Sequence, residues 1–143
     1  MVADDILRRK GRDTITVAPD ATLIEAADTL SEYNIGALVV TDDDGTVAGV
    51  LSERDVVQAL SEQGSDALTA TVREVVDGEA LTCTPEDDVK GLMKQVTRRR
   101  ARHLPVVADG TVDGVISVGD LLKTRLQEME TEKKVLQDRL LDC

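Results

Sequence analysis

Apolar residues recur along the chain in two spacings, and together they predict the same order of strands and helices twice. Short β-branched runs predict strands over residues 15–17, 37–41 and 46–51, and again over 81–83, 104–107 and 112–116. Helical spacing predicts helices over 22–33 and 87–99, and two more that begin at Ser52 and Ser117. Shorter lead-in helices are expected at 3–10 and 71–76. Each half therefore reads β-α-β-β-α, which predicts an α/β (α+β) fold with helices packed on a mixed sheet.

The run Asp42-Asp43-Asp44-Gly45 joins two of the predicted strands and is typical of a hairpin turn. Its acidic residues also suggest a calcium-binding loop. An EF-hand loop would need an acid at the position of Val40 and a glutamate at the position of Leu51. Both residues are apolar, so the pattern favours the turn.

The last predicted helix continues well beyond the second half. Its apolar residues follow a spacing of four and three, with Lys133 at one position of the stripe: Leu122, Leu126, Met129, Leu136 and Leu140. As a helix, residues 118–141 would measure about 36 Å, which is long for packing on so small a body. The pattern favours a helix that faces a partner over one that folds back onto its own domain.

One motif occurs in each half, as Gly49-Val50-Leu51-Ser52-Glu53-Arg54-Asp55-Val56-Val57 and as Gly114-Val115-Ile116-Ser117-Val118-Gly119-Asp120-Leu121-Leu122. In both copies a strand leads into a helix whose N-cap is a serine. Such a helix start leaves backbone N–H groups unpaired and attracts anions. The alternative is a capping box, which only begins a helix. Asp55 and Asp120 would repel phosphate but can accept hydrogen bonds from ribose hydroxyls, so the two copies favour a ribose-phosphate group.

The two motif copies belong to a duplication that covers most of the chain. Pro19 and Pro85 lie 66 positions apart, and Gly49 and Gly114 lie 65 apart. A register kept this closely indicates two repeats, which we expect to pack as a pseudo-twofold pair. We predict a first repeat with its lead-in helix over 1–67, a second over 68–125 and a helical extension over 126–143. Residues 64–70 are predicted to be a polar linker.

Composition and charge limit the cellular compartments and the classes of binding partner that we expect. The 143 residues carry a formal net charge of −11, so free nucleic acid would be repelled. Phe and Trp are absent, so the core is expected to be aliphatic. The chain has no apolar run long enough to span a bilayer and no signal-peptide pattern, and its cysteines, Cys83 and Cys143, suggest no disulfide framework. We expect a cytoplasmic protein that binds neither nucleic acid nor membrane.

Residues able to perform catalysis are sparse. His103 is the single histidine, and the chain has neither a Walker motif nor Gly-x-Gly-x-x-Gly, so no catalytic residue, metal site or enzyme activity is predicted. The run Arg98-Arg99-Arg100-Ala101-Arg102-His103 is densely basic in an acidic chain. A helix end accounts for one or two such cations. We expect Arg102 and His103 to neutralise phosphate and the others to form a solvated face, while Arg54 either assists at the first motif or is an ordinary surface residue.

These features together resemble a known family. Thr16-Val17-Ala18-Pro19 and Thr82-Cys83-Thr84-Pro85 open the repeats, the second contains Arg102-His103-Leu104-Pro105-Val106-Val107, and both carry Gly-x-x-Ser-x-x-Asp. Over residues 14–125 the chain is similar to a tandem pair of cystathionine β-synthase (CBS) domains, also called a Bateman module. As a whole it resembles small stand-alone bacterial proteins of this family. The first repeat differs, with Asn34-Ile35-Gly36-Ala37-Leu38 in place of the basic residues.

The resemblance implies ligand binding in a cleft between the repeats. Family members bind AMP, ADP or ATP, and some bind NAD(H) or S-adenosylmethionine. What we name the Asp120 site would comprise Thr16, Ala37, Leu38, Arg102, His103, Ile116, Ser117 and Asp120. The Asp55 site would comprise Ser52, Arg54, Asp55, Thr82, Leu104 and Pro105. The Asp120 site is favoured, because it holds the basic residues.

Two functions remain open. The chain is either a non-catalytic sensor that binds an adenine nucleotide and reports it through a dimer or partner interface, or a structural docking module with degenerate pockets. In both cases we expect a homodimer, which members of the family commonly form. An unidentified regulated protein is a further expected partner.

Overall fold

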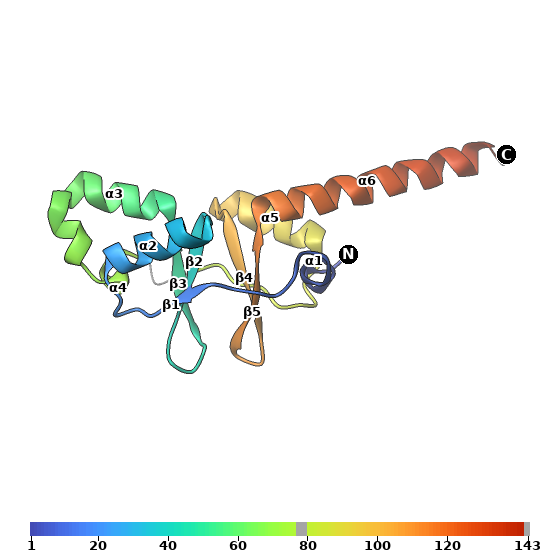
Figure 1. The fold of residues 1–143 in the computed structure, drawn as a ribbon. Coiled ribbons are helices and arrows are strands. Elements are labelled where there is room, and N and C mark those ends of the chain that lie inside the picture. The colour runs from blue at the N-terminus through green and yellow to red at the C-terminus, as the bar shows by residue number, and fades with distance from the viewer. Residues whose placement is uncertain (77–79, 142–143) are drawn as a thin grey trace.

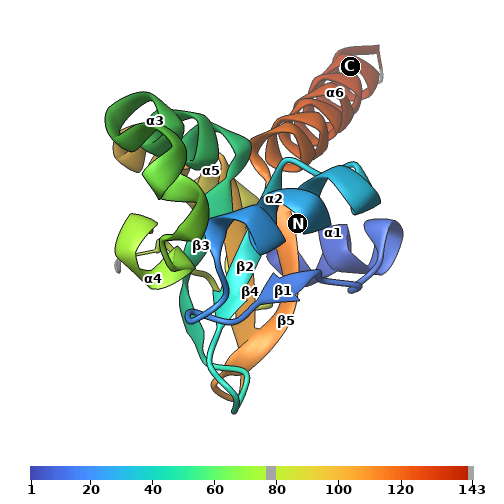
Figure 2. The same ribbon diagram turned by 60° about the vertical axis from the view of Figure 1, so that its left-hand side comes forward.

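Two β-hairpins stand side by side at the centre of the molecule, with helices grouped over one end (Figures 1 and 2). This computed structural model describes residues 1–76 and 80–141. In chain order its elements are α1 Ala3–Lys10, β1 Thr16–Val17, α2 Leu23–Tyr33, β2 Ala37–Thr41, β3 Val47–Ser52, α3 Glu53–Gln63, the 3-10 helix η1 Gly64–Thr69, α4 Val72–Val75, α5 Val89–Arg99, β4 His103–Ala108, β5 Thr111–Ser117 and α6 Val118–Leu141. The predicted order of elements is confirmed in both repeats, apart from the strand at 81–83.

Each hairpin belongs to its own small sheet. In the first repeat β1 is parallel to β2, and β2 is antiparallel to β3, which is the expected mixed sheet. In the second repeat β4 and β5 are antiparallel, and the predicted strand at 81–83 is reduced to one parallel bridge between Cys83 and Val106. The two backbone hydrogen bonds of Cys83, to Pro105 O and from Val107 N, hold this bridge at 3.0 and 2.7 Å.

The turn between β2 and β3 is a hairpin turn, as predicted. Gly45 has a φ of +85°, which a glycine adopts without steric cost. Its N–H donates to Asp42 O at 2.9 Å, and the Asp44 carboxylate accepts the Thr46 N–H at 3.1 Å. The Asp44 side chain and the Asp42 backbone carbonyl therefore both stabilise the turn.

The core consists of two aliphatic clusters, one in each repeat. The first is built around Leu23, Leu30, Leu38, Leu51 and Val56, and the second around Leu92, Val96, Leu104, Ile116 and Leu121. Aliphatic side chains fill both clusters, as the composition predicts. Residues 64–70 are not merely a linker, because η1 inserts the fully buried Ala67 into the first cluster.

The lead-in helices are exchanged between the repeats. Helix α1, which precedes the first repeat, places Ala3, Ile6 and Leu7 in the cluster of the second repeat. Helix α4, which precedes the second repeat, places Val72 in the cluster of the first. Each cluster is therefore completed by a helix from the other side of the predicted boundary at residues 67 and 68.

Matching backbone hydrogen bonds hold the two exchanged helices. At α1, Ala3 N donates to Asp87 O at 2.9 Å and Asp4 N donates to Pro85 O at 2.9 Å. The same two bonds recur at α4, from Val72 N to Ala21 O at 2.8 Å and from Arg73 N to Pro19 O at 2.9 Å. This repetition supports the pseudo-twofold arrangement of the repeats.

Helix α6 projects away from the body of the molecule, which argues against the folded-back alternative (Figure 1). Only its first turns pack on the second repeat, through Leu121 and Thr124. The side chains of the predicted stripe are largely exposed: Leu122, Leu126, Met129, Leu136 and Leu140. Cys143, the last residue, lies outside the described residues.

Candidate functional site

A cleft of about 580 Å³ lies between the first repeat and the segment that leads into β4 of the second. This volume is within the range of ~300–1,000 Å³ that is usual for small-molecule sites. Its wall consists of Gly36, Val50, Ser52, Glu53, Arg54, Asp55, Ala80, Leu81, Arg99, Arg100, Ala101, Arg102 and His103. The cleft therefore combines one copy of the repeated motif with the basic run of the other repeat.

Ser52 and Asp55 form a capping box at the start of α3. The Ser52 N–H donates to Asp55 Oδ2 at 2.8 Å, and the Asp55 N–H donates to Ser52 Oγ at 3.2 Å. The Glu53 N–H donates to Gly36 O at 3.0 Å. Two of the first three N–H groups of the helix are thus already paired, so the helix start attracts anions less than the sequence suggests. Asp55 Oδ1 is left for a further hydrogen bond.

The second motif copy has the same capping geometry. The Ser117 N–H donates to Asp120 Oδ2 at 2.9 Å, and the Asp120 N–H donates to Ser117 Oγ at 3.1 Å. The Val118 N–H donates to Arg102 O at 2.9 Å. The capping function is therefore real in both copies, and any ligand-binding function is additional to it.

The cleft gathers cations that have no acidic partner. Arg54, Arg99, Arg100 and Arg102 are exposed, and none of them forms an ion pair among residues 1–76 and 80–141. Elsewhere in the molecule arginines pair with carboxylates, as Arg12 does with Asp113 at 2.6 Å. With Glu53 and Asp55, the four arginines give the wall a formal charge of +2 in a chain of −11. Such a region attracts anions from solution.

His103 is half-buried at the start of β4. Desolvation lowers the pKa of His103 below 6.5, and the nearby charges of Lys10 and Arg102 lower it further, against the opposing effect of Asp120 and Glu53. The side chain is therefore mainly neutral at pH 7 and is a hydrogen-bonding group rather than a cation.

Asp120 has a partner of its own in Lys10. Lys10 Nζ donates to Asp120 Oδ2 at 2.7 Å and to Val115 O at 3.0 Å. Burial alone would raise the pKa of Asp120, but the hydrogen bonds from Lys10 and Ser117 outweigh it and lower the pKa below 3.8. Lys10 therefore adds a cationic partner to one oxygen of the carboxylate proposed to accept a ribose, while Asp120 Oδ1 is left for a further hydrogen bond as Asp55 Oδ1 is.

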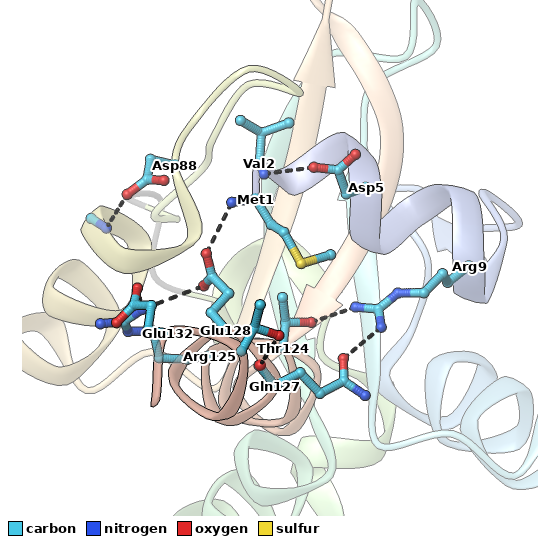
Figure 3. Close-up of polar contacts among 12 residues, drawn as sticks. Met1, Val2, Asp5, Arg9, Asp88, Thr124, Arg125, Gln127, Glu128 and Glu132 are labelled. Atoms are coloured by element: carbon cyan, nitrogen blue, oxygen red, sulfur yellow. Dashed lines mark hydrogen bonds and ion pairs between the residues drawn. The ribbon is translucent and has the colours of Figure 1, made fainter. Parts of the chain in front are cut away.

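Helix α1 is also tied to the base of α6 (Figure 3). Arg9 donates to Thr124 Oγ1 and to Gln127 Oε1, both at 2.7 Å. The N-terminal ammonium of Met1 donates to Glu128 Oε2 at 2.9 Å. Lys10 therefore approaches Asp120 from a helix whose position depends on α6.

The structure regroups the residues of the two predicted sites. Arg102 and His103 lie in the cleft with Ser52, Arg54 and Asp55, although the sequence pattern assigns them to the Asp120 site. The same two residues also adjoin the other motif copy, because His103 pairs with Ser117 between β4 and β5 and the Val118 N–H donates to Arg102 O, so the basic residues do not by themselves favour the Asp120 site. Several other predicted residues do not line the cleft: Thr16, Ala37, Leu38, Thr82, Leu104, Pro105, Ile116, Ser117 and Asp120. Of these, Leu38, Leu104 and Ile116 are fully buried in the core clusters.

Some residues of the cleft are missed by the sequence analysis. Arg99 and Arg100 belong to the basic run but are predicted to be a solvated face, whereas both line the cleft. Ala80 and Leu81 line it in place of Thr82, one or two residues earlier in the chain. The density of the basic run is the feature of the sequence that could have identified the arginines. Gly36 is equivalent to Arg102 in the structure, because Gly36 O accepts the Glu53 N–H as Arg102 O accepts the Val118 N–H.

Within the described part of the chain, no cluster of three or more His, Cys, Asp or Glu side chains is arranged to hold a metal ion. The helices in that part all lack the combination of length and hydrophobicity that crossing a bilayer requires.

Comparisons with known proteins agree on one family. The family model of the CBS domain matches residues 3–62 and again 72–126. A CBS-domain containing protein from Agrobacterium tumefaciens has a similar structure, with a TM-score of 0.81, 42% identity, and coverage of 87% of this chain and 99% of that chain. A mitochondrial CBS domain-containing protein of Arabidopsis thaliana is 29% identical over 136 residues, which are 90% of this chain and 66% of that protein.

A third similarity concerns the fold alone. The CBS domain pair of protein MJ0100, solved in complex with 5'-methylthioadenosine and S-adenosyl-L-methionine, has a TM-score of 0.78 at 22% identity. The match covers 90% of this chain and 98% of that chain.

Proposed function

The chain belongs to the CBS domain family and carries two CBS repeats, and on this basis we propose that it is a non-catalytic regulatory module that binds an adenine nucleotide. The ligand would occupy the cleft lined by Ser52, Asp55 and the basic run. AMP, ADP, ATP and NAD(H) are the candidate ligands.

One observation carries this proposal: four arginines that form no ion pair with a described residue share a cleft with the Ser-Asp motif. Arg54 and Arg102 would bind phosphate, because guanidinium groups form bidentate hydrogen bonds with phosphate oxygens. Asp55 Oδ1 would accept a hydrogen bond from a ribose hydroxyl. Val50, Leu81 and Ala101 are the apolar part of the wall and would contact the base.

The Asp55 site takes precedence over the Asp120 site in this proposal. The basic residues that decide the ranking are those of the cleft at Asp55. A ligand at Asp120 would share the carboxylate with Lys10, which donates to Asp120 Oδ2 at 2.7 Å. We therefore propose one principal site, with Asp120 as a weaker second site.

The charge of the cleft separates the candidate ligands. S-adenosylmethionine carries a sulfonium cation and methylthioadenosine carries no phosphate, so neither would gain from four arginines. Both bind the CBS pair of MJ0100. A phosphorylated nucleotide fits the cleft of this chain better than either of them.

Ligand binding would regulate a partner by changing the contact surfaces of the module, and not by catalysing a reaction. Helix α1 contacts the second repeat, Asp120 and the base of α6, so a ligand that binds at the weaker Asp120 site and moves Lys10 would also shift the contacts of α6. The exposed stripe of α6 is the surface through which we propose that a homodimer or a regulated protein responds. The docking-only module remains the alternative, and it predicts no nucleotide binding.

Isothermal titration calorimetry with AMP, ADP, ATP and NADH tests the proposal. We expect a dissociation constant in the micromolar range, about −8 kcal/mol, for at least one of them. Asp55→Ala should weaken binding by about 1.5–3 kcal/mol, the usual contribution of a hydrogen bond to a charged group. Asp120→Ala removes the same capping interaction in the other repeat and should weaken binding less than Asp55→Ala, because Asp120 belongs to the weaker second site. No binding and no thermal shift with any nucleotide would favour the docking module.

A further inference from the structure

Arg100 has an unusual backbone conformation at the wall of the cleft. It is the C-cap of α5, with φ +53° and ψ +32°, and its N–H donates to Val96 O. This left-handed region is unfavourable for residues with a Cβ, and helices that end in it generally use Gly or Asn. An arginine here therefore has a conformational cost that the sequence could have avoided.

In the first repeat, the equivalent helix end has a residue that adopts this conformation at a lower cost. Asn34 occupies the equivalent position, 66 residues earlier, as the C-cap of α2 with φ +51° and ψ +51°. Asparagine tolerates this conformation because its short side chain can hydrogen-bond locally. Two helix ends of the same shape thus carry a well-suited residue in the first repeat and a poorly suited one in the second.

Helix stability does not account for the arginine. Arg98 and Arg99 already place cations in the last turn of α5, where they offset the helix dipole. Arg100 forms no ion pair within the described residues, and its side chain is exposed at the cleft. Backbone strain that the fold does not need is concentrated at functional sites.

The number of arginines indicates how many phosphate groups a ligand of the cleft carries. Each guanidinium has five N–H donors, whereas the terminal phosphate of a monophosphate offers three oxygens. Arg54 comes from α3, and Arg99, Arg100 and Arg102 come from the end of α5 and the segment before β4. A chain of two or three phosphates offers more oxygens, spread over a greater length, than one phosphate group, so it can form bidentate hydrogen bonds with arginines on both sides of the cleft.

We infer that the cleft selects nucleotides with two or more phosphates and that Arg100 is a residue that determines this selection. The inference rests on the proposed function, since it concerns the same cleft. Arg102 would then contact the phosphate nearest the ribose, and Arg100 would contact a phosphate beyond it.

The substitution Arg100→Asn tests this by giving the second repeat the cap residue of the first. Calorimetry with ADP, AMP and adenosine on the full chain should show wild type binding ADP about tenfold more tightly than AMP. Arg100→Asn should weaken ADP binding about tenfold and leave AMP and adenosine nearly unchanged. Its melting temperature without ligand should equal or exceed that of wild type, because the left-handed strain is relieved.

Arg98→Gln is the matched control. It removes the same charge from the same helix end, but Arg98 does not line the cleft, so ADP binding should change little. Equal losses for Arg98→Gln and Arg100→Asn would mean a general charge effect and would overturn the inference. So would an Arg100→Asn protein that loses ADP and AMP affinity equally and melts at a lower temperature, since Arg100 would then be structural. A wild-type protein that binds no nucleotide at all is a different result, which refutes the proposed function and this inference with it.

Discussion

The glycine that opens the second motif copy gives the most direct test of the exchanged lead-in helices. A Cβ added at Gly114 would lie 2.6 Å from Leu7 Cδ2 and 3.0 Å from Leu7 Cδ1. Leu7 belongs to α1, is 1% exposed and lies in the second cluster, so its side chain can shift only against its neighbours in that cluster. The φ of Gly114 lies outside the left-handed region, so the cost of Gly114→Ala is a steric clash and not a backbone effect.

The size of the effect follows from this packing. Forcing a methyl group into a filled core costs about 1–3 kcal/mol. Removing the opposing side chain with Leu7→Ala costs about 2–5 kcal/mol by itself, because it leaves a cavity. In the double variant the clash is gone and the new methyl fills part of the cavity. The two changes should therefore couple by about 1–2 kcal/mol, so that the double variant is more stable than the sum of the single losses predicts.

Urea denaturation followed by far-ultraviolet circular dichroism measures all four proteins of this cycle. Gly91→Ala is the control, because a Cβ there meets no atom within 4 Å and Gly91 lies inside α5. That substitution should raise the free energy of unfolding by about 0.5–1 kcal/mol. If Gly114→Ala is as harmless as Gly91→Ala, or if the losses from Leu7→Ala and Gly114→Ala simply add, then α1 does not pack on β5 and the exchange is wrong.

Three further predictions concern acid stability, assembly and thiol reactivity. Because hydrogen bonds from Lys10 and Ser117 outweigh desolvation and hold the pKa of Asp120 below 3.8, this stabilisation is present above that pH and is lost as the pH falls through the lower folded-state pKa. Urea titrations of wild type and Lys10→Met should differ at neutral pH and converge in strong acid; a gap that persists unchanged contradicts this. Light scattering at tens of micromolar should show a dimer for the full chain and a monomer for Leu136→Asp with Leu140→Asp, while Gln137→Asp, one position off the stripe, stays dimeric; a wild-type monomer refutes the assembly. Burial raises the pKa of Cys83 to about 12, so in a Cys143→Ser background a disulfide reagent at pH 8 should label it only after unfolding; rapid labelling of the folded protein would be incompatible with its buried position.

Local chemistry in the sequence determines most of the elements. The capping boxes at Ser52 and Ser117 and the turn at Gly45 each depend on residues within a few positions of one another. The spacing of apolar residues predicts α2, α5 and the two hairpins, because this spacing also depends only on residues close together in the chain. Where the local signal is short it is less reliable, and the strand expected at 81–83 is reduced to a bridge at Cys83 alone.

Only the tertiary structure decides which copy of the motif lies beside the basic run and which lies beside Lys10. The chain is a duplication, so the motif at Asp55 and the motif at Asp120 have the same local pattern. The local patterns do not predict that Arg102 and His103 line the same cleft as Asp55, or that Lys10 forms an ion pair with Asp120. These choices follow from α1 packing on the second repeat and α4 on the first, through contacts between residues far apart in the chain. Two nearly equivalent repeats present equivalent local signals, and long-range packing is what makes them different.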